Sequence, residues 1–238
     1  MTALYNALFY QPLVNSLVFL YETLPYQDLG LAIIGLTIFI RALLYPFVAK
    51  SLRAQKALSE LQPEIRALQE KYKDKKEEQA KQLMELYRTR GVNPVSGCLP
   101  VLIQLPLLFA LYHVFSNITN PEALNALYGF VPRPEFINSM AFGFLNLAEP
   151  SIPLAILAGL SQFLQGYLMP RHAAGAGGES QFAHAMQTQT IYFLPIVITV
   201  ISFKFAAALP LYWTVLNIIG ILQQEGFFLK NKKERAPK

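Results

Sequence analysis

The sequence has few charged residues and almost no cysteine. Its 238 residues include a single cysteine, Cys98, so a framework of disulfides within the chain is excluded. Charged residues make up 15% of the chain, against roughly 25% in an average soluble domain. Hydrophobic residues make up 53%, and this share excludes an intrinsically disordered chain. The chain therefore folds, and few charges are available to cover its surface.

Basic residues and catalytic motifs are also scarce. No lysine or arginine precedes Arg41, so the N-terminus resembles neither a secretory signal, which begins with positive charge, nor an arginine-rich transit peptide. The three histidines have no acid or cysteine at ligand spacing, so we expect no metal and no cofactor. The chain has no Walker motif, no glycine-rich phosphate loop and no Ser/His/Asp set on its apolar segments. We therefore expect a protein that is not an enzyme.

The hydrophobic residues gather into segments long enough to cross the roughly 30 Å hydrocarbon core of a bilayer. The five segments span residues 29–49, 95–116, 151–169, 190–208 and 210–229. They predict an all-α, multi-pass membrane protein with a five-helix bundle. Because almost no loop separates the last two segments, we expect them to form a tight antiparallel pair.

The N-terminal segment, residues 1–28, has a different pattern. It is apolar but contains Pro12, and it carries Gln11, Asn15 and Glu22 near one helical face. A helix that buries one side only is typical of the membrane interface. We therefore predict an interfacial amphipathic helix, and a true membrane span is the competing interpretation.

Residues 50–94 predict a charged helical hairpin outside the membrane. The first helix has apolar residues at alternating steps of three and four, which is typical of a seam between helices: Leu58, Leu61, Ile65, Leu68 and Tyr72. The second helix has its own apolar set at helical spacing: Ala80, Leu83, Met84 and Tyr87. We expect the turn at residues 73–76 and the end of the second helix at Gly91, followed by Asn93-Pro94.

The distribution of basic residues predicts the orientation. The hairpin carries 11 of the 20 lysines and arginines, and the tail at residues 230–238 carries five. The loop at residues 117–150 has one basic residue and three acids. The positive-inside rule then places the N-terminus outside the cell, and the hairpin and tail on the cytoplasmic side of a cell membrane. Because the basic clusters flank apolar segments, the net charge of +5 does not indicate a nucleic-acid site.

Arg41 lies near the centre of the first predicted span, where a charge costs about 2.5–3.5 kcal/mol on insertion scales. No acidic residue lies in the interior of any predicted span. Arg41 either extends to a headgroup or faces a polar cavity within the bundle, and the second interpretation fits better. Uncharged polar or amphipathic side chains on the spans are candidates to line the cavity: Thr37, Gln104, Gln162, Gln165, Tyr212, Trp213 and Asn217. Each of them alone is better explained by a hydrogen bond between helices, and it is their presence together with an unpaired arginine that favours the cavity.

Three motifs, in this order around the charged hairpin, resemble the YidC family of membrane-protein insertases. They are TIFIRALLYP (37–46), VNPVSGCLPVLIQLPLLFALYHVF (92–115) and LPLYWTVLNIIGILQQ (209–224). The resemblance extends from about Leu29 to Phe228 and covers the five-span core without the large extracytoplasmic domain of many members. It implies a hydrophilic groove that is open to the cytoplasm and to lipid.

The resemblance also implies roles for single residues. Arg41 corresponds to the arginine that lines the groove, Thr37 to the nearby threonine and Gln104 to the glutamine of the second span. Trp213, with Tyr212 beside it, corresponds to the aromatic position that contacts substrate. Gln165 corresponds to a glutamine of the third span, and a shift in the match would exchange it for Gln162.

The implied partners are nascent membrane proteins and the lipid bilayer, with the Sec translocon and the ribosome as further partners. The tail is short for a ribosome-binding role. The alternative function is a transporter or channel for a small anion or solute, since an unpaired arginine also binds anions.

Overall fold

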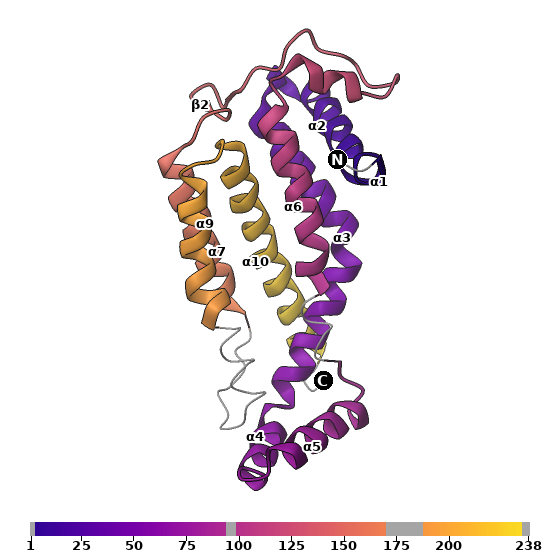
Figure 1. Cartoon of the computed structure of the whole chain (residues 1–238), viewed down its shortest axis with the longest axis vertical. Helices are drawn as coiled ribbons and strands as arrows, with labels where there is room; N and C mark the ends of the chain where they lie inside the picture. Colours follow the sequence, from indigo (N-terminus) through magenta and orange to yellow (C-terminus); the bar gives the residue numbers. More distant parts are fainter. Residues whose placement is uncertain (1–2, 94–98, 170–187, 235–238) are drawn as a thin grey trace.

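The computed structural model describes residues 3–93, 99–169 and 188–234, and this part of the chain is mostly helical (Figure 1). Cys98, the glycine- and alanine-rich stretch at 171–180 and the last four residues lie outside the described residues. The N-terminal part contains α1 (Ala3–Tyr5), the π-helix η1 (Asn6–Tyr10), α2 (Gln11–Thr23) and the 3-10 helix η2 (Pro25–Gln27). The longer helices are α3 (Leu29–Glu60), α4 (Gln62–Lys71), α5 (Lys76–Thr89), α6 (Leu99–Asn117), α7 (Ile152–Leu168), α9 (Leu194–Ser202) and α10 (Ala208–Glu234).

The long helices form a bundle with α10 at its centre. In Figure 1, α10 lies between the α7 and α9 pair on one side and α3 with α6 on the other, and it contacts α7, α3 and α6. The π-helix η5 (Gln189–Phe193) leads into α9. Apolar side chains point outward from α3, α6, α7 and α9 and stay exposed, as in Leu43, Phe109, Leu160 and Ile196. An outward-facing apolar surface of this kind is expected where lipid surrounds a helix bundle.

The first long helix, α3, continues past the predicted span. Asp28 caps its N-terminus, because the carboxylate accepts a hydrogen bond from the Leu31 N–H at 2.9 Å. Residues 50–60, which we assigned to the hairpin, continue α3 because no glycine or proline interrupts the helix before Pro63. Among the described residues, α3 is the one helix long and apolar enough to cross a membrane by length and composition. Shorter apolar helices cover 102–117, 152–168 and 189–202, so the five-span topology stays a prediction.

The last two apolar helices do not form the expected pair. Instead, α9 packs against α7, and α10 packs against α7 and α3. Small residues explain the preference: a methyl group at Gly159 of α7 would overlap the Thr199 hydroxyl of α9 and lie 3.2 Å from the Pro195 carbonyl. Helix α9 also ends early, at Ser202, and residues 203–207 form the turn into α10. The short sequence separation of the two helices therefore did not decide which surfaces pack together.

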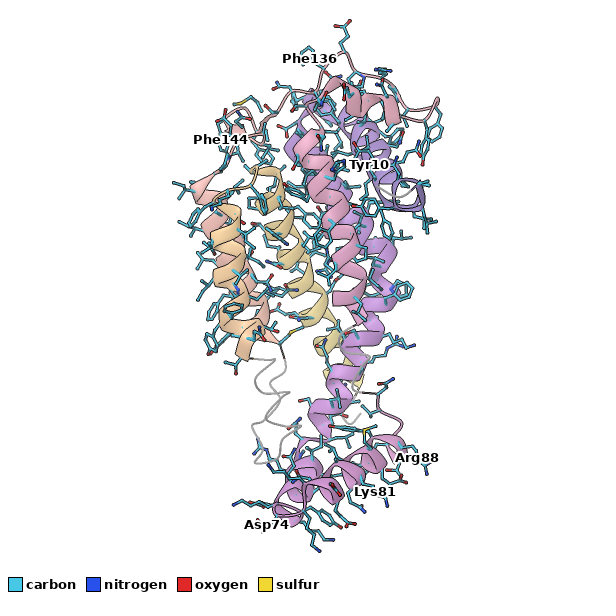
Figure 2. The ribbon with its side chains drawn as sticks, in the orientation of Figure 1. Tyr10, Asp74, Lys81, Arg88, Phe136 and Phe144 are labelled. Carbon is cyan, nitrogen blue, oxygen red and sulfur yellow. The ribbon has the colours of Figure 1, made fainter. Side chains whose placement is uncertain are left out.

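The hairpin has a small core of its own. Leu61, Ile65 and Leu83 are buried together, apart from the main core of the bundle. The buried Gln79 of α5 donates a hydrogen bond to the Gln69 carbonyl of α4, at 2.8 Å. Figure 2 shows the charged side chains Asp74, Lys81 and Arg88 pointing away from the hairpin. Helix α5 ends before Gly91, whose positive φ of 64° permits the turn.

Residues 118–151, between α6 and α7, form a cap loop over the end of the bundle opposite the hairpin (Figure 1). It contains the 3-10 helix η4 (Pro121–Ala126) and a two-stranded antiparallel ribbon of β1 (Met140–Ala141) and β2 (Leu145–Asn146). Its main chain also pairs with the turn before α10, because the Ala207 N–H donates to the Glu149 carbonyl at 2.8 Å.

Side chains of the N-terminal segment hold the cap loop in place. The buried Asn15 donates to the Ala126 carbonyl at 3.0 Å and accepts from the Tyr128 N–H at 2.6 Å. Gln11 donates to the same carbonyl of Ala126 at 3.3 Å. The two polar side chains thus face protein, whereas apolar residues of α2 pack on α3 and α6. Tyr10, labelled in Figure 2, joins that contact. Its ring lies 4.9 Å from the ring of His113.

Candidate functional site

Arg41 turns its guanidinium from α3 toward α10. Its Nη2 donates a hydrogen bond to the main-chain carbonyl of Leu216, at 3.1 Å. Its Nε is buried and has no hydrogen-bond partner among the described residues. The two ion pairs of the described residues, Glu85–Arg88 and Glu64–Arg90, do not include Arg41. Arg41 is therefore a cation inside the bundle, held by a carbonyl and with one N–H donor unused.

One stripe of α10 meets the neighbouring helices in turn. Tyr212, Leu216 and Gly220 are spaced four residues apart, so they lie on one helical face. Tyr212 is almost fully buried, and its hydroxyl accepts a hydrogen bond from the Gln104 amide of α6 at 2.6 Å. The face thus brings α6 and α3 to adjacent turns of α10.

The third position of the stripe, Gly220, faces Gln165 of α7. A methyl group at Gly220 would overlap the Gln165 amide nitrogen and would lie 3.3 Å from Arg41 Nη2. The side chains of Gln165 and Arg41 therefore both approach α10 at this glycine. Gln162 is half-buried on the same helix, three residues earlier.

A second polar contact joins α10 to α7. The buried Asn217 amide donates to the Ser161 hydroxyl at 3.0 Å, and that hydroxyl donates to the Ala158 carbonyl at 2.9 Å. A hydrogen bond between buried side chains on facing helices aligns the two helices. Asn217 was a sequence candidate, whereas Ser161 was not.

Two sequence candidates lie apart from the contacts of Arg41 with α10. The Thr37 hydroxyl is buried and donates to the carbonyl of Ile33 in its own helix, at 2.6 Å. Trp213 is buried in the main core, 9% exposed, so its ring packs against protein in this conformation. The structure therefore gathers Arg41, Gln104, Gln165 and Tyr212 around α10, with Thr37 and Trp213 in the surrounding packing.

The sequence analysis missed Gly220. A glycine in a helix has no side chain to suggest a role, and its role depends on which side chains approach it. A usable signal was present, because Gly220 lies eight residues after the candidate Tyr212, on the same helical face.

Comparison with known proteins decides the family. A family model described as 60Kd inner membrane protein matches residues 19–235, which include every residue of the site. The chain belongs to this family. The resemblance to YidC insertases that the three motifs indicated is thereby confirmed.

Relatives in the 60Kd inner membrane protein family carry the name membrane protein insertase YidC. The relative from Oceanobacillus iheyensis is 36% identical over 216 residues, which are 89% of this chain and 78% of the relative. The relatives from Francisella philomiragia and Francisella tularensis subsp. novicida are 38% and 39% identical over 195 residues, 82% of this chain. The chain spans 31% of the length of each Francisella relative.

Proposed function

We propose that the chain is a membrane protein insertase of the cell membrane, which helps nascent membrane proteins enter the lipid bilayer and fold there. The name of the relatives supports this function, and so does the site. The observation that carries the mechanism is Arg41: a cation in the bundle that no carboxylate of the described residues neutralises. A cation left without a counter-charge, with an N–H donor to spare, can attract an acceptor group from a passing chain.

The polar groups of α10 favour a groove that opens toward the hairpin. From Leu209 to Leu216, on the cap side, α10 is mostly buried in the apolar core. On the hairpin side, the side-chain oxygens of Gln223 and Gln224 are buried and have no hydrogen-bond partner among the described residues. On α10, unused polar atoms on the hairpin side of Arg41 and apolar packing on the cap side support a hydrophilic groove closed at the cap.

Such a groove lowers the cost of moving a polar flank through the membrane. Each unsatisfied backbone group costs several kcal/mol in hydrocarbon, and polar groups of the groove replace part of the lost hydrogen bonding. A fixed positive charge draws acidic residues of the flank inward and disfavours basic ones. The apolar segment that follows then partitions into lipid by its own hydrophobicity, so the mechanism requires no covalent step.

The proposed topology has five spans, an external N-terminus and a cytoplasmic hairpin and tail. The basic hairpin lies at the opposite end of the bundle from the cap loop, which agrees with this orientation. The cytoplasmic side would then meet the ribosome and the Sec translocon, and the N-terminal segment would lie at the outer interface.

Reconstitution in liposomes tests the function. Purified protein should increase the insertion of a short substrate with one or two spans, measured as protease-protected fragment against liposomes without protein. Uptake of a small anion in the same vesicles, without any increase in insertion, would contradict the proposal and favour the transporter.

A further inference from the structure

The glycine at position 220 lowers the stability of helix α10. In a helix interior it costs about 1 kcal/mol relative to alanine, because it loses more backbone freedom and offers no side chain. Gly220 is buried in α10, so flexibility toward solvent does not explain it. Gly226 on the same helix is exposed, with nothing within 4 Å of where a methyl group would lie. The two glycines thus have different surroundings on one element.

At Gly220 the missing side chain makes room for two others. A methyl group would overlap the amide nitrogen of Gln165 and come within 3.0 Å of its Cδ. It would also lie 3.3 Å from Arg41 Nη2, which is closer than side chains normally pack. Both neighbours are the ends of long side chains, so they would be displaced and the helices could stay in place.

The glycine also uncovers the carbonyl that holds Arg41. In an α-helix the carbonyl of residue i bonds to the N–H of residue i+4, and its second lone pair is free for another donor. The side chain of residue i+4 flanks that lone pair. Gly220 is residue i+4 to Leu216, and its lack of a side chain leaves the Leu216 carbonyl open to Arg41 Nη2 at 3.1 Å.

We propose that Gly220 is a positioning residue. Because it has no side chain, the Gln165 amide and the Arg41 guanidinium can both lie against α10 at this position, and the guanidinium can reach the Leu216 carbonyl. This placement sets how strongly Arg41 attracts acidic segments of a substrate. The last statement rests on the proposed insertase function, and the placement itself does not.

The decisive variant is Gly220→Ala, with two matched glycines as references. Gly226→Ala meets open space, so alanine should raise the melting temperature Tm by roughly 2–4 °C through helix propensity. Gly159→Ala meets the Thr199 side chain and the Pro195 carbonyl, so it should lower Tm and report a purely structural glycine. Gly220→Ala should show little of the gain seen with Gly226→Ala, because a methyl group there displaces Gln165 and Arg41.

A double substitution tests the placement without any activity measurement. In a Gln165→Ala background the amide is gone, so Gly220→Ala should recover most of the gain in Tm that Gly226→Ala shows. An equal effect of Gly220→Ala in both backgrounds would overturn the contact between the glycine and Gln165.

Insertion then tests the consequence for charge. Two substrates with the same apolar span, one with an acidic and one with a neutral translocated flank, are inserted by each variant. Gly220→Ala should lower the ratio of acidic to neutral insertion by roughly three- to tenfold, and Gly226→Ala should leave it unchanged. An unchanged ratio with Gly220→Ala, while the original chain inserts both substrates, would overturn the positioning role. If the original chain inserts neither substrate, the insertase function itself is wrong, and the double substitution still decides the contact.

Discussion

At the scale of single residues, the charge of Arg41 is the feature that the proposed mechanism uses most directly. Its hydrogen bond to the Leu216 carbonyl does not neutralise it, and the two ion pairs of the described residues do not include it. An arginine held in this way keeps its attraction for acidic groups. A carboxylate in its place would repel them.

We predict that Arg41→Glu lowers insertion about tenfold or more for a substrate with an acidic translocated flank, and much less for a neutral one. The measurement is the protected fraction of each substrate in proteoliposomes. Lys204→Glu is the matched control, because Lys204 is exposed in the turn before α10 and undergoes the same change of charge. Equal losses for both substrates with Arg41→Glu would mean that Arg41 acts through folding alone.

Asn15 carries a structural role at the same scale. Its buried amide is bonded to the Ala126 carbonyl and the Tyr128 N–H of the cap loop. Asn15→Ala removes the hydrogen bonds to both main-chain groups, so we predict a Tm lower by about 4–10 °C. Asn6→Ala, at an exposed position of the same segment, should leave Tm nearly unchanged. A Tm shift for Asn15→Ala no larger than that for Asn6→Ala would show that the cap loop is held by other contacts.

At the scale of elements, the hairpin is separate from the bundle in its packing. Its core consists of Leu61, Ile65 and Leu83, and α4 touches the bundle chiefly where it follows α3. So small a core leaves the hairpin with little stability of its own. The hairpin can therefore open while the bundle stays folded.

We predict that Leu83→Ala opens the hairpin without unfolding the bundle. Replacing leucine by alanine in a core costs about 2–5 kcal/mol of stability. We expect this loss to exceed the stability of a hairpin whose core has three buried side chains. Hydrogen exchange should become fast in α4 and α5 and stay unchanged in α7 and α10. Met84→Ala is the control, since Met84 is 59% exposed. Faster exchange throughout the chain would contradict the independence of the hairpin.

The elements also show how far the sequence predicts the structure. Periodicity and turn residues predicted α5 and α7 to within a few residues, because local signals such as Gly91 and Pro94 bound α5. The extension of α3 through residues 50–60 was missed because a change from apolar to charged composition alters what surrounds a helix, without breaking it.

Contacts between helices were harder to predict than the helices themselves. Arg41 and Gln165 were predicted candidates because their chemistry is unusual in an apolar span. The pairing of α9 with α7 and the role of Gly220 depend on small residues, whose effect appears only when another helix approaches.

At the scale of the whole molecule, the two ends of the bundle differ in kind. The cap end is joined by hydrogen bonds among the N-terminal segment, the cap loop and the turn before α10. The hairpin end has basic charge and unused polar atoms near the end of α10. The proposed groove would therefore open at the hairpin end, and labelling measures which side reaches position 41.

We predict that a cysteine at position 41 reacts with a membrane-impermeant maleimide from the hairpin side and not from the cap side. The background is Cys98→Ser, which removes the only native thiol. Cysteines at Lys81 and at Phe144 serve as references for the two sides, since Lys81 lies on the hairpin and the exposed Phe144 on the cap loop (Figure 2). The Phe144 cysteine should react from the opposite side to the Lys81 cysteine. The groove does not open toward the hairpin if the cysteine at position 41 is labelled from the same side as the Phe144 cysteine, or if it stays unlabelled while both references react. For the charge to act on a substrate, a polar path from the hairpin end must reach the arginine.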